Sequence, residues 1–133
     1  QSTSCFTRLS LGADHRSNTV WTPGATRGVG LGMTSQPAEP GDLVVACARH
    51  VMEAPDLVAL ALDPPVFSLL RLDVTAEADM KQIAAGMTRK IDIRDGNAGI
   101  VNGYGGLEDR AHHSGAIEAV MMTNVAGVFC TAR

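Results

Sequence analysis

The segment IRDGNAGIVNGYGGLEDRAHH, residues 93–113, holds the residue types in this chain that are best suited to bind a ligand or to carry out chemistry. It has five glycines within its first fourteen residues and ends on two adjacent histidines. Three kinds of site use such residues: a glycine loop that cradles phosphate, a metal centre with histidine ligands, and a tight turn surrounded by hydrogen-bonding side chains. The spacing of the residues separates the three.

A phosphate-cradling loop requires a strand, then the glycines, then a helix whose backbone N–H groups meet the phosphate. Residues 93–113 instead suggest a strand at AGIVN, then glycines, then more extended chain. A second glycine cluster, GVGLG at residues 28–32, lies in a segment so rich in Gly and Pro that no long helix is expected there. Both clusters are therefore interpreted as bends between strands, where glycine permits positive φ.

The two adjacent histidines do not form a metal-binding motif. On a strand, His112 and His113 point to opposite faces, and no H-x-H or H-x-x-E-H spacing occurs. A metal site would need further ligands brought in by the fold. The available side chains are those of His15, His50, Glu108 and Asp109. No metal and no cofactor are predicted.

The three cysteines, Cys5, Cys47 and Cys130, stand far apart without a C-x-x-C pair. This sparse, odd count favours a reducing compartment over a disulfide framework. His50 follows Cys47 by three residues, so both could share one face of a helix, but the apolar surroundings of Cys47 indicate a core position. A small enzyme with a site between subunits stays open as an alternative, using His112 or His113 with Asp109 or a cysteine.

Polar side chains flank the glycine bend and would converge on a small anionic ligand, because loops on rigid scaffolds commonly carry binding sites. The competing interpretation is ordinary turn chemistry. The expected ligand-binding residues are Asn97, Asn102, Tyr104, Arg110, His112 and His113.

The elements that must position these residues follow from the pattern of apolar side chains. Residues 1–40 are expected to be a glycine-rich extended or loop segment. Helical spacing of apolar residues predicts helices over 42–53 and 76–91, with Glu77 and Asp79 in the first turn of the second. Strands are predicted at 57–62, 66–74, 98–102 and 116–130, the last apolar on both alternations.

The 133 residues fit a single domain, and 45% hydrophobic residues suffice for a core. A charged fraction of only 19% favours a homo-oligomer. The net charge of −3 and the scattered basic residues argue against autonomous nucleic-acid binding. No signal peptide and no run approaching the roughly 18 apolar residues of a membrane span are recognised, so a cytoplasmic location without membrane partners is expected.

Residues 66–130 resemble part of the PPC (plants and prokaryotes conserved) domain. FSLLRLDVTAEADMKQIAAGM resembles its strand and acidic-capped helix, IRDGNAGIVNGYGGLEDRA its glycine signature, and AIEAVMMTNVAGVF its next strand. Gly103, Gly105 and Leu107 occupy the anchor positions of that signature. The family's later H-x-H…G-G-H signature has no counterpart in this chain.

The resemblance implies an α/β (α+β) fold with a mainly antiparallel curved sheet, two principal helices and a homotrimeric assembly. It favours a non-catalytic binding or regulatory module, associated with DNA or with a small ligand, over an enzyme. DNA association would use a basic face built from copies of Arg89, Lys90 and Arg94. The AT-hook that supports DNA binding in plant members is absent here.

Overall fold

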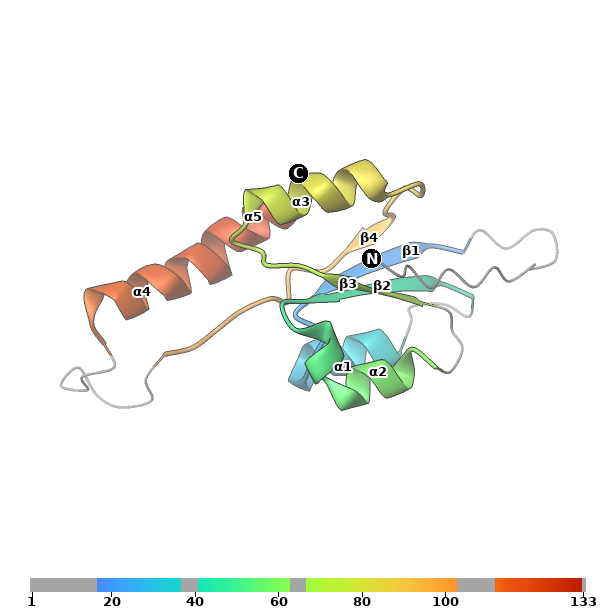
Figure 1. Ribbon diagram of the computed structural model, residues 1–133, viewed down its shortest axis with the longest axis horizontal. Coiled ribbons are helices and arrows are strands. Elements are labelled where there is room, and N and C mark those ends of the chain that lie inside the picture. Colours follow the sequence, from blue (N-terminus) through green and yellow to red (C-terminus); the bar gives the residue numbers. More distant parts are fainter. Residues whose placement is uncertain (1–16, 37–40, 63–66, 103–111, 133) are drawn as a thin grey trace.

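The computed structural model describes residues 17–36, 41–62, 67–102 and 112–132. Figure 1 shows a central sheet between two layers of helices. The sheet contains the strands β1 (Thr19–Pro23), β2 (Leu43–Ala48), β3 (Phe67–Arg71) and β4 (Ile93–Arg94), in the order β3-β2-β1-β4. Each pairing between these strands is parallel.

Helices connect the strands and cover both faces of the sheet. The first layer holds α1 (Gly28–Ser35), the 3₁₀ turn η1 (Val51–Glu53) and α2 (Pro55–Leu60), and α3 (Glu77–Gly86) lies on the opposite face (Figure 1). A long final helix runs through α4 (Ser114–Met121), the π-helical turn η2 (Met122–Ala126) and α5 (Gly127–Ala132). Its α5 end lies beside α3, whereas α4 extends beyond the sheet (Figure 1).

The expected antiparallel α+β fold is wrong. Strands and helices alternate from β1 to α4, and short strands joined by helical crossovers form a parallel sheet. The antiparallel expectation came from the resemblance and not from the residues. Two elements that would have revealed the alternation, β1 and α1, fall in the segment that was expected to be a loop.

β2 corrects the helix predicted over 42–53. Its residues LVVACA are almost entirely buried, because a central parallel strand is covered on both faces. A continuous apolar run of this length matches the spacing of a helix as well as that of a strand. Pro55 then opens α2 and occupies its first turn, where the missing N–H of proline is tolerated.

The final helix corrects the strand predicted at 116–130. Large apolar side chains remain exposed along it, among them Ile117, Met121 and Phe129. Because both faces carry apolar residues, the sequence shows no helical period. By length and composition alone, Ser114–Ala132 could cross a membrane, although no such segment was expected. A helix of a soluble protein can meet the same criteria, so this is weak evidence.

Two predicted elements are confirmed in part. β3 lies inside the strand expected at 66–74, and α3 covers the first part of the helix expected at 76–91. Met80, Ile83 and Met87 of the predicted apolar stripe pack against the buried cluster around Trp21. The strand expected at 98–102 does not form, since the preceding residues Ile93–Arg94 pair with β1 instead.

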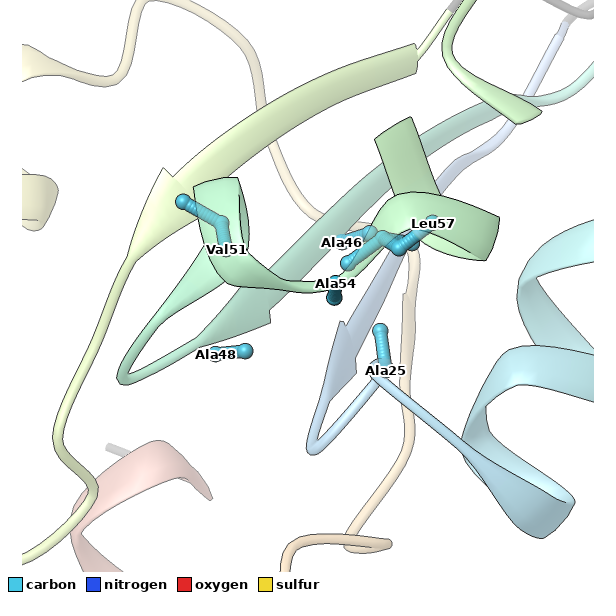
Figure 2. Packing of buried hydrophobic residues seen from close by; sticks show 6 residues of the cluster. All are labelled: Ala25, Ala46, Ala48, Val51, Ala54 and Leu57. Carbon is cyan, nitrogen blue, oxygen red and sulfur yellow. The ribbon is translucent and has the colours of Figure 1, made fainter. Parts of the chain in front are cut away.

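A small-residue core anchors the segment that follows β1. Ala25 is fully buried and packs with Ala46 of β2 and Leu57 of α2, as Figure 2 shows. Alanines at these positions bring the helix layer close to the sheet, and Leu57 fills the remaining space. Apolar contacts with β2 and α2 therefore support the turn between β1 and α1.

Candidate functional site

The candidate site lies where the strand order reverses. From β1 the chain moves outward to β2 and β3 on one side, whereas β4 adds on the other side. In open parallel sheets, ligands bind outside the carboxyl ends of the strands at such a switch point. The residues that follow β1, β2 and β4 therefore define the site.

A glycine turn leads from β1 directly into α1. Gly24 has φ +75° and Gly28 has φ +56°, both in the left-handed region that favours glycine. Arg27, the N-cap residue of α1, makes no side-chain capping hydrogen bond. The first N–H groups of α1 thus meet no capping side chain from this residue, and the positive end of the helix dipole lies at the turn.

Gly30 leaves no room for a side chain. A Cβ at this position would overlap the carbonyl oxygen of Gly24 and the Nδ2 of Asn97. At Gly24, a Cβ would lie 2.9 Å from the Cα of Ala98. The turn is thus pressed against the chain that follows β4, and glycine is required by space at Gly30 and by both space and conformation at Gly24.

Asn97 joins the two sides of the switch point. Its Nδ2 donates hydrogen bonds to the carbonyl oxygens of Pro23 and Gly24, at 3.2 Å and 3.1 Å. These two carbonyls end β1 and begin the glycine turn. One amide therefore fixes the loop after β4 relative to the turn that precedes α1.

This arrangement corrects the interpretation of GVGLG as a bend between strands. A strand, a glycine turn and a helix follow one another over residues 19–35, which is the order that phosphate binding requires. The strand TVWTP is only five residues long and ends on Pro23, and the prediction treated the whole region as loop.

Asn124 forms a second clamp on the loop after β4. Its Oδ1 accepts a hydrogen bond from the backbone N–H of Ile100, and its Nδ2 donates to the carbonyl oxygen of Ile100, both at 2.8 Å. Asn124 belongs to the π-helical turn η2, a distortion that is frequent at functional sites. These two side-chain hydrogen bonds fix the loop to the long helix, since the loop itself does not pair with a strand.

A cavity of about 700 Å³ opens between these elements. It extends from the carboxyl end of β2 and the glycine turn to the loop after β4 and the long helix. Among the described residues, its lining contains two arginines and two asparagines and no acidic side chain. The lining residues are Arg27, Arg49, Gly99, Ile100, Val101, Asn102 and Asn124.

Two carboxyl groups near the strand ends have shifted pKa values. Hydrogen bonds from the Thr75 side chain and backbone lower the pKa of Asp73, and Arg49 and Arg71 lower it further. Burial raises the pKa of Asp95, although a hydrogen bond from the backbone of Asn97 opposes this shift. Asp73 is therefore stabilised as the anion, whereas the surroundings of Asp95 disfavour its charged form.

The structure brings some of the predicted ligand-binding residues together and separates others. Asn97 clamps the glycine turn, and Asn102 lines the cavity. His113 instead caps α4, where its Nδ1 accepts a hydrogen bond from the backbone N–H of Ala116 at 3.1 Å. His112 is exposed beside it. Two further predicted residues, Tyr104 and Arg110, lie outside the described residues, as does Asp109 of the alternative enzyme site.

The proposed pairing of a histidine with a cysteine does not fit. Cys47 is fully buried in β2, and burial raises the pKa of its thiol, which disfavours the reactive thiolate. His50 lies exposed after the end of that strand, so the two do not share a helix face. Within the described ranges, no group of three or more His, Cys, Asp or Glu side chains could hold a metal.

Sequence reasoning missed most residues of this site: Gly24, Arg27, Gly30, Arg49 and Asn124. A detectable signal was present, namely the spacing G-x-x-x-G-x-G directly after the short β-branched and aromatic run TVWTP. The role of Asn124 had no such signal, because its partner Ile100 is 24 residues away in sequence.

Comparison with known proteins agrees with this geometry. The family model described as short chain dehydrogenase matches residues 18–133. No curated protein matches the sequence.

Solved structures share the fold. A short-chain dehydrogenase from Streptomyces avermitilis has a TM-score of 0.75 and 24% identity, with 90% of this chain and 43% of that chain covered. A closed form of serine dehydrogenase complexed with NADP+ has a TM-score of 0.71 and 27% identity, with 86% and 46% covered. A short-chain dehydrogenase from Sphingobium yanoikuyae in complex with NADPH has a TM-score of 0.68 and 24% identity, with 86% and 45% covered. The chain thus spans less than half the length of these three structures.

These findings overturn the PPC resemblance and the conclusions drawn from it. The family model is that of the short chain dehydrogenases, which are enzymes, so both the non-catalytic module and the DNA-associated role are wrong, as is the leaning against an enzyme. The expected absence of a cofactor is wrong too, because family structures hold NADP+ and NADPH. The small enzyme built on histidine with Asp109 or a cysteine fails for the same reason. The chain belongs to the short chain dehydrogenase family.

Proposed function

We propose that this chain binds a nicotinamide dinucleotide and forms the cofactor-binding part of an oxidoreductase. The observation that carries the proposal is the glycine turn at the switch point, where Gly30 admits no side chain. Such a turn allows the diphosphate of a dinucleotide to approach the backbone closely. The NADP+ complex of the 27% identical serine dehydrogenase supports the same cofactor class.

The residues present fit such a cofactor. The N-terminal amides of α1, from Gly28 onward, would hold the diphosphate, since they point towards the turn and the helix dipole favours an anion. The loop Gly99–Asn102 would line the remainder of the dinucleotide, because it borders the same cavity. When bound, a nicotinamide cofactor supplies the acceptor or donor of a hydride.

Asn97 and Asn124 would act as positioning residues. Both are engaged with backbone atoms, Asn97 with the glycine turn and Asn124 with Ile100. Together they hold the loop after β4 in a single place relative to α1. A cofactor bound between the loop and the helix would therefore meet a site that needs little rearrangement, which favours affinity.

The proposal is tested by titrating the full chain with NAD+, NADH, NADP+ and NADPH in a calorimeter. At least one of the four should bind at a single site with an affinity in the range of about 1 μM to 1 mM that is typical of enzyme ligands. Inosine serves as a control, because it offers a nucleoside without a diphosphate. Absence of saturable binding of all four dinucleotides would refute the proposed function.

We also propose that the chain self-associates through the long final helix. Short chain dehydrogenases are commonly oligomeric, and Ile117, Met121, Val125 and Phe129 expose apolar side chains along this helix. Burial of such a stripe is the usual way to remove it from water. Light scattering should show a multimer that Phe129→Glu shifts towards monomer. A monomeric wild-type chain would contradict the proposal. The homotrimer expected earlier rested on the PPC resemblance alone, so no particular number of subunits is proposed here.

The location and domain organisation stay proposals. Short chain dehydrogenases are typically soluble enzymes, which supports a cytoplasmic location. A single domain is proposed because each described strand joins the same sheet. Fractionation of cells that express the protein, and a single cooperative unfolding transition, would test the two statements.

A further inference from the structure

We infer that Asp95 makes dinucleotide binding at this site sensitive to pH: the neutral carboxyl group favours binding, the carboxylate opposes it, and affinity falls as the pH rises. The inference rests on the proposed function and adds a regulatory group to it. Its basis is an ionisable side chain directly after β4 whose Oδ2 is buried and, among the described residues, has no hydrogen-bond partner. Asp95 does not belong to the described lining of the cavity.

Asp95 lies beside the end of β1, on the face of the sheet that α2 covers. Its backbone N–H donates to the carbonyl oxygen of Trp21 at 3.0 Å, so Asp95 continues the pairing of β4 with β1 and comes next to Thr22. Thr22 is aligned with Ala46 of β2, which packs in the apolar core under α2. Because aligned residues of neighbouring strands share a face, the side chains of Thr22 and Asp95 both lie on this side.

The two side-chain oxygens at this place favour a neutral Asp95. Thr22 is fully buried, and in the described part of the chain neither its Oγ1 nor the Oδ2 of Asp95 has a partner at hydrogen-bond geometry. Burial raises the pKa of Asp95, and the opposing effects of the Asn97 backbone and the Thr22 hydroxyl are smaller. A proton on Asp95 removes a buried charge and supplies a donor for the Thr22 oxygen, and unpaired buried charges are costly.

No cation compensates the carboxylate. β1, α1 and the loop of residues 96–102 contain no ionisable side chain. Arg94 binds the carbonyl oxygen of Ala132 at 2.6 Å, and no charged group of the described residues is a cause of the pKa shift of Asp95. The ionisable residues on or next to the surrounding elements are Arg27 before α1, Asp56 on α2, Asp92 and Arg94 at β4, and Cys130 on α5.

A chain of hydrogen bonds places Asp95 next to the proposed diphosphate site. The backbone N–H of Asn97 donates to the Asp95 carboxyl group, and the side chain of Asn97 donates to the carbonyl oxygens of Pro23 and Gly24 in the glycine turn. A diphosphate at this turn would bring further negative charge close to Asp95, and like charges disfavour each other. By linkage, a bound dinucleotide then increases the proton affinity of Asp95.

The first experiment measures stability and needs no dinucleotide. Because the folded state raises the pKa of Asp95, its contribution to stability is complete below the ordinary value of 3.8 and is lost as the pH rises through the folded value. Asp95→Asn keeps the shape without the charge. Its urea midpoint, relative to wild type, should therefore be higher at about pH 7.5 than at about pH 4.5. Asp56→Asn, which removes an exposed carboxylate from α2, is the matched control and should follow the wild-type profile.

The second experiment titrates the full chain with NAD+ and NADP+ in a calorimeter at the same two pH values. From the lower to the higher pH, the affinity of wild type should fall by roughly fivefold or more relative to Asp95→Asn. Wild type should also take up protons on binding, so its binding enthalpy should vary with the ionisation enthalpy of the buffer more than that of Asp95→Asn. Thr22→Val removes the hydroxyl that lowers the pKa of Asp95 and should move the change in affinity to higher pH.

The outcomes separate this inference from the proposed function. Equal pH profiles of stability for wild type and Asp95→Asn would overturn the role of Asp95 as a titrating group. A stability difference without any difference in the pH dependence of affinity would overturn its coupling to the dinucleotide while leaving dinucleotide binding intact. Failure of every dinucleotide to bind wild type would refute the proposed function and the coupling, and the stability measurement would still decide whether Asp95 titrates as described.

Discussion

Replacing Gly30 with alanine is expected to reduce dinucleotide affinity by roughly 10- to 100-fold, the equivalent of the 1–3 kcal/mol that overpacking typically costs. The added Cβ would overlap the carbonyl oxygen of Gly24 and the Nδ2 of Asn97. Both atoms belong to the contact between the glycine turn and the loop after β4. Relief of the overlap must move one of these segments and thereby deform the binding site.

Gly32→Ala provides the matched control for this prediction. Gly32 lies two residues further along α1, and a Cβ there would meet no atom within 4 Å. Because alanine is the better helix former by about 1 kcal/mol, Gly32→Ala should bind dinucleotides like wild type and unfold at the same or a higher temperature. Wild-type affinity in Gly30→Ala would show that the close approach at Gly30 does not shape the site.

The substitution Asn97→Asp is expected to destabilise the protein by about 2–4 kcal/mol, since it leaves two backbone carbonyls without a donor. The shape of the side chain is unchanged, but an oxygen replaces the Nδ2 that lies 3.2 Å and 3.1 Å from the carbonyl oxygens of Pro23 and Gly24. The negative carboxylate would then face these two oxygens. Urea denaturation at pH 7 measures the difference.

A comparison of wild type with two variants makes this prediction specific. Asn97→Ala also removes the donor but adds no opposing charge, so wild type should be the most stable, Asn97→Ala less stable, and Asn97→Asp the least stable of the three. Dinucleotide affinity should follow the same order, because the same amide holds the loop against the glycine turn. An aspartate variant as stable as wild type would show that the two hydrogen bonds of Asn97 contribute little to stability.

Part of the fold could be predicted from local pattern alone. Apolar and polar residues alternate over residues 70–74, at the end of β3 and directly after it. α3 has an apolar stripe with acidic residues in its first turn, so period and charge placement agree. In these elements apolar and polar residues recur at the period of the element itself. The burial that the strand and helix need is therefore visible in the order of residues.

The elements that build the site could not be predicted in this way. β2 is covered on both faces and the long final helix carries apolar residues on several faces, so neither displays its period. The antiparallel sheet was then inferred from the resemblance to the PPC domain. The motifs of that resemblance are glycines and aliphatic residues, which occur in many folds and therefore could not distinguish an antiparallel from a parallel sheet. Because the fold class, the cofactor and the function were inferred from these incorrect elements and from the resemblance, those predictions were wrong as well.

From residue order alone came an apolar content sufficient for a core and the β3–α3 unit, because each depends on composition or on neighbours close in the chain. Which residues lie together in the site depends on the tertiary structure. Asn97 reaches Pro23 and Gly24 across more than 70 residues, and Arg49 joins Arg27 at one cavity only because β1 and β2 lie side by side. Parallel pairing brings the carboxyl ends of distant strands to one edge of the sheet, and no local pattern of residues records which ends will meet there.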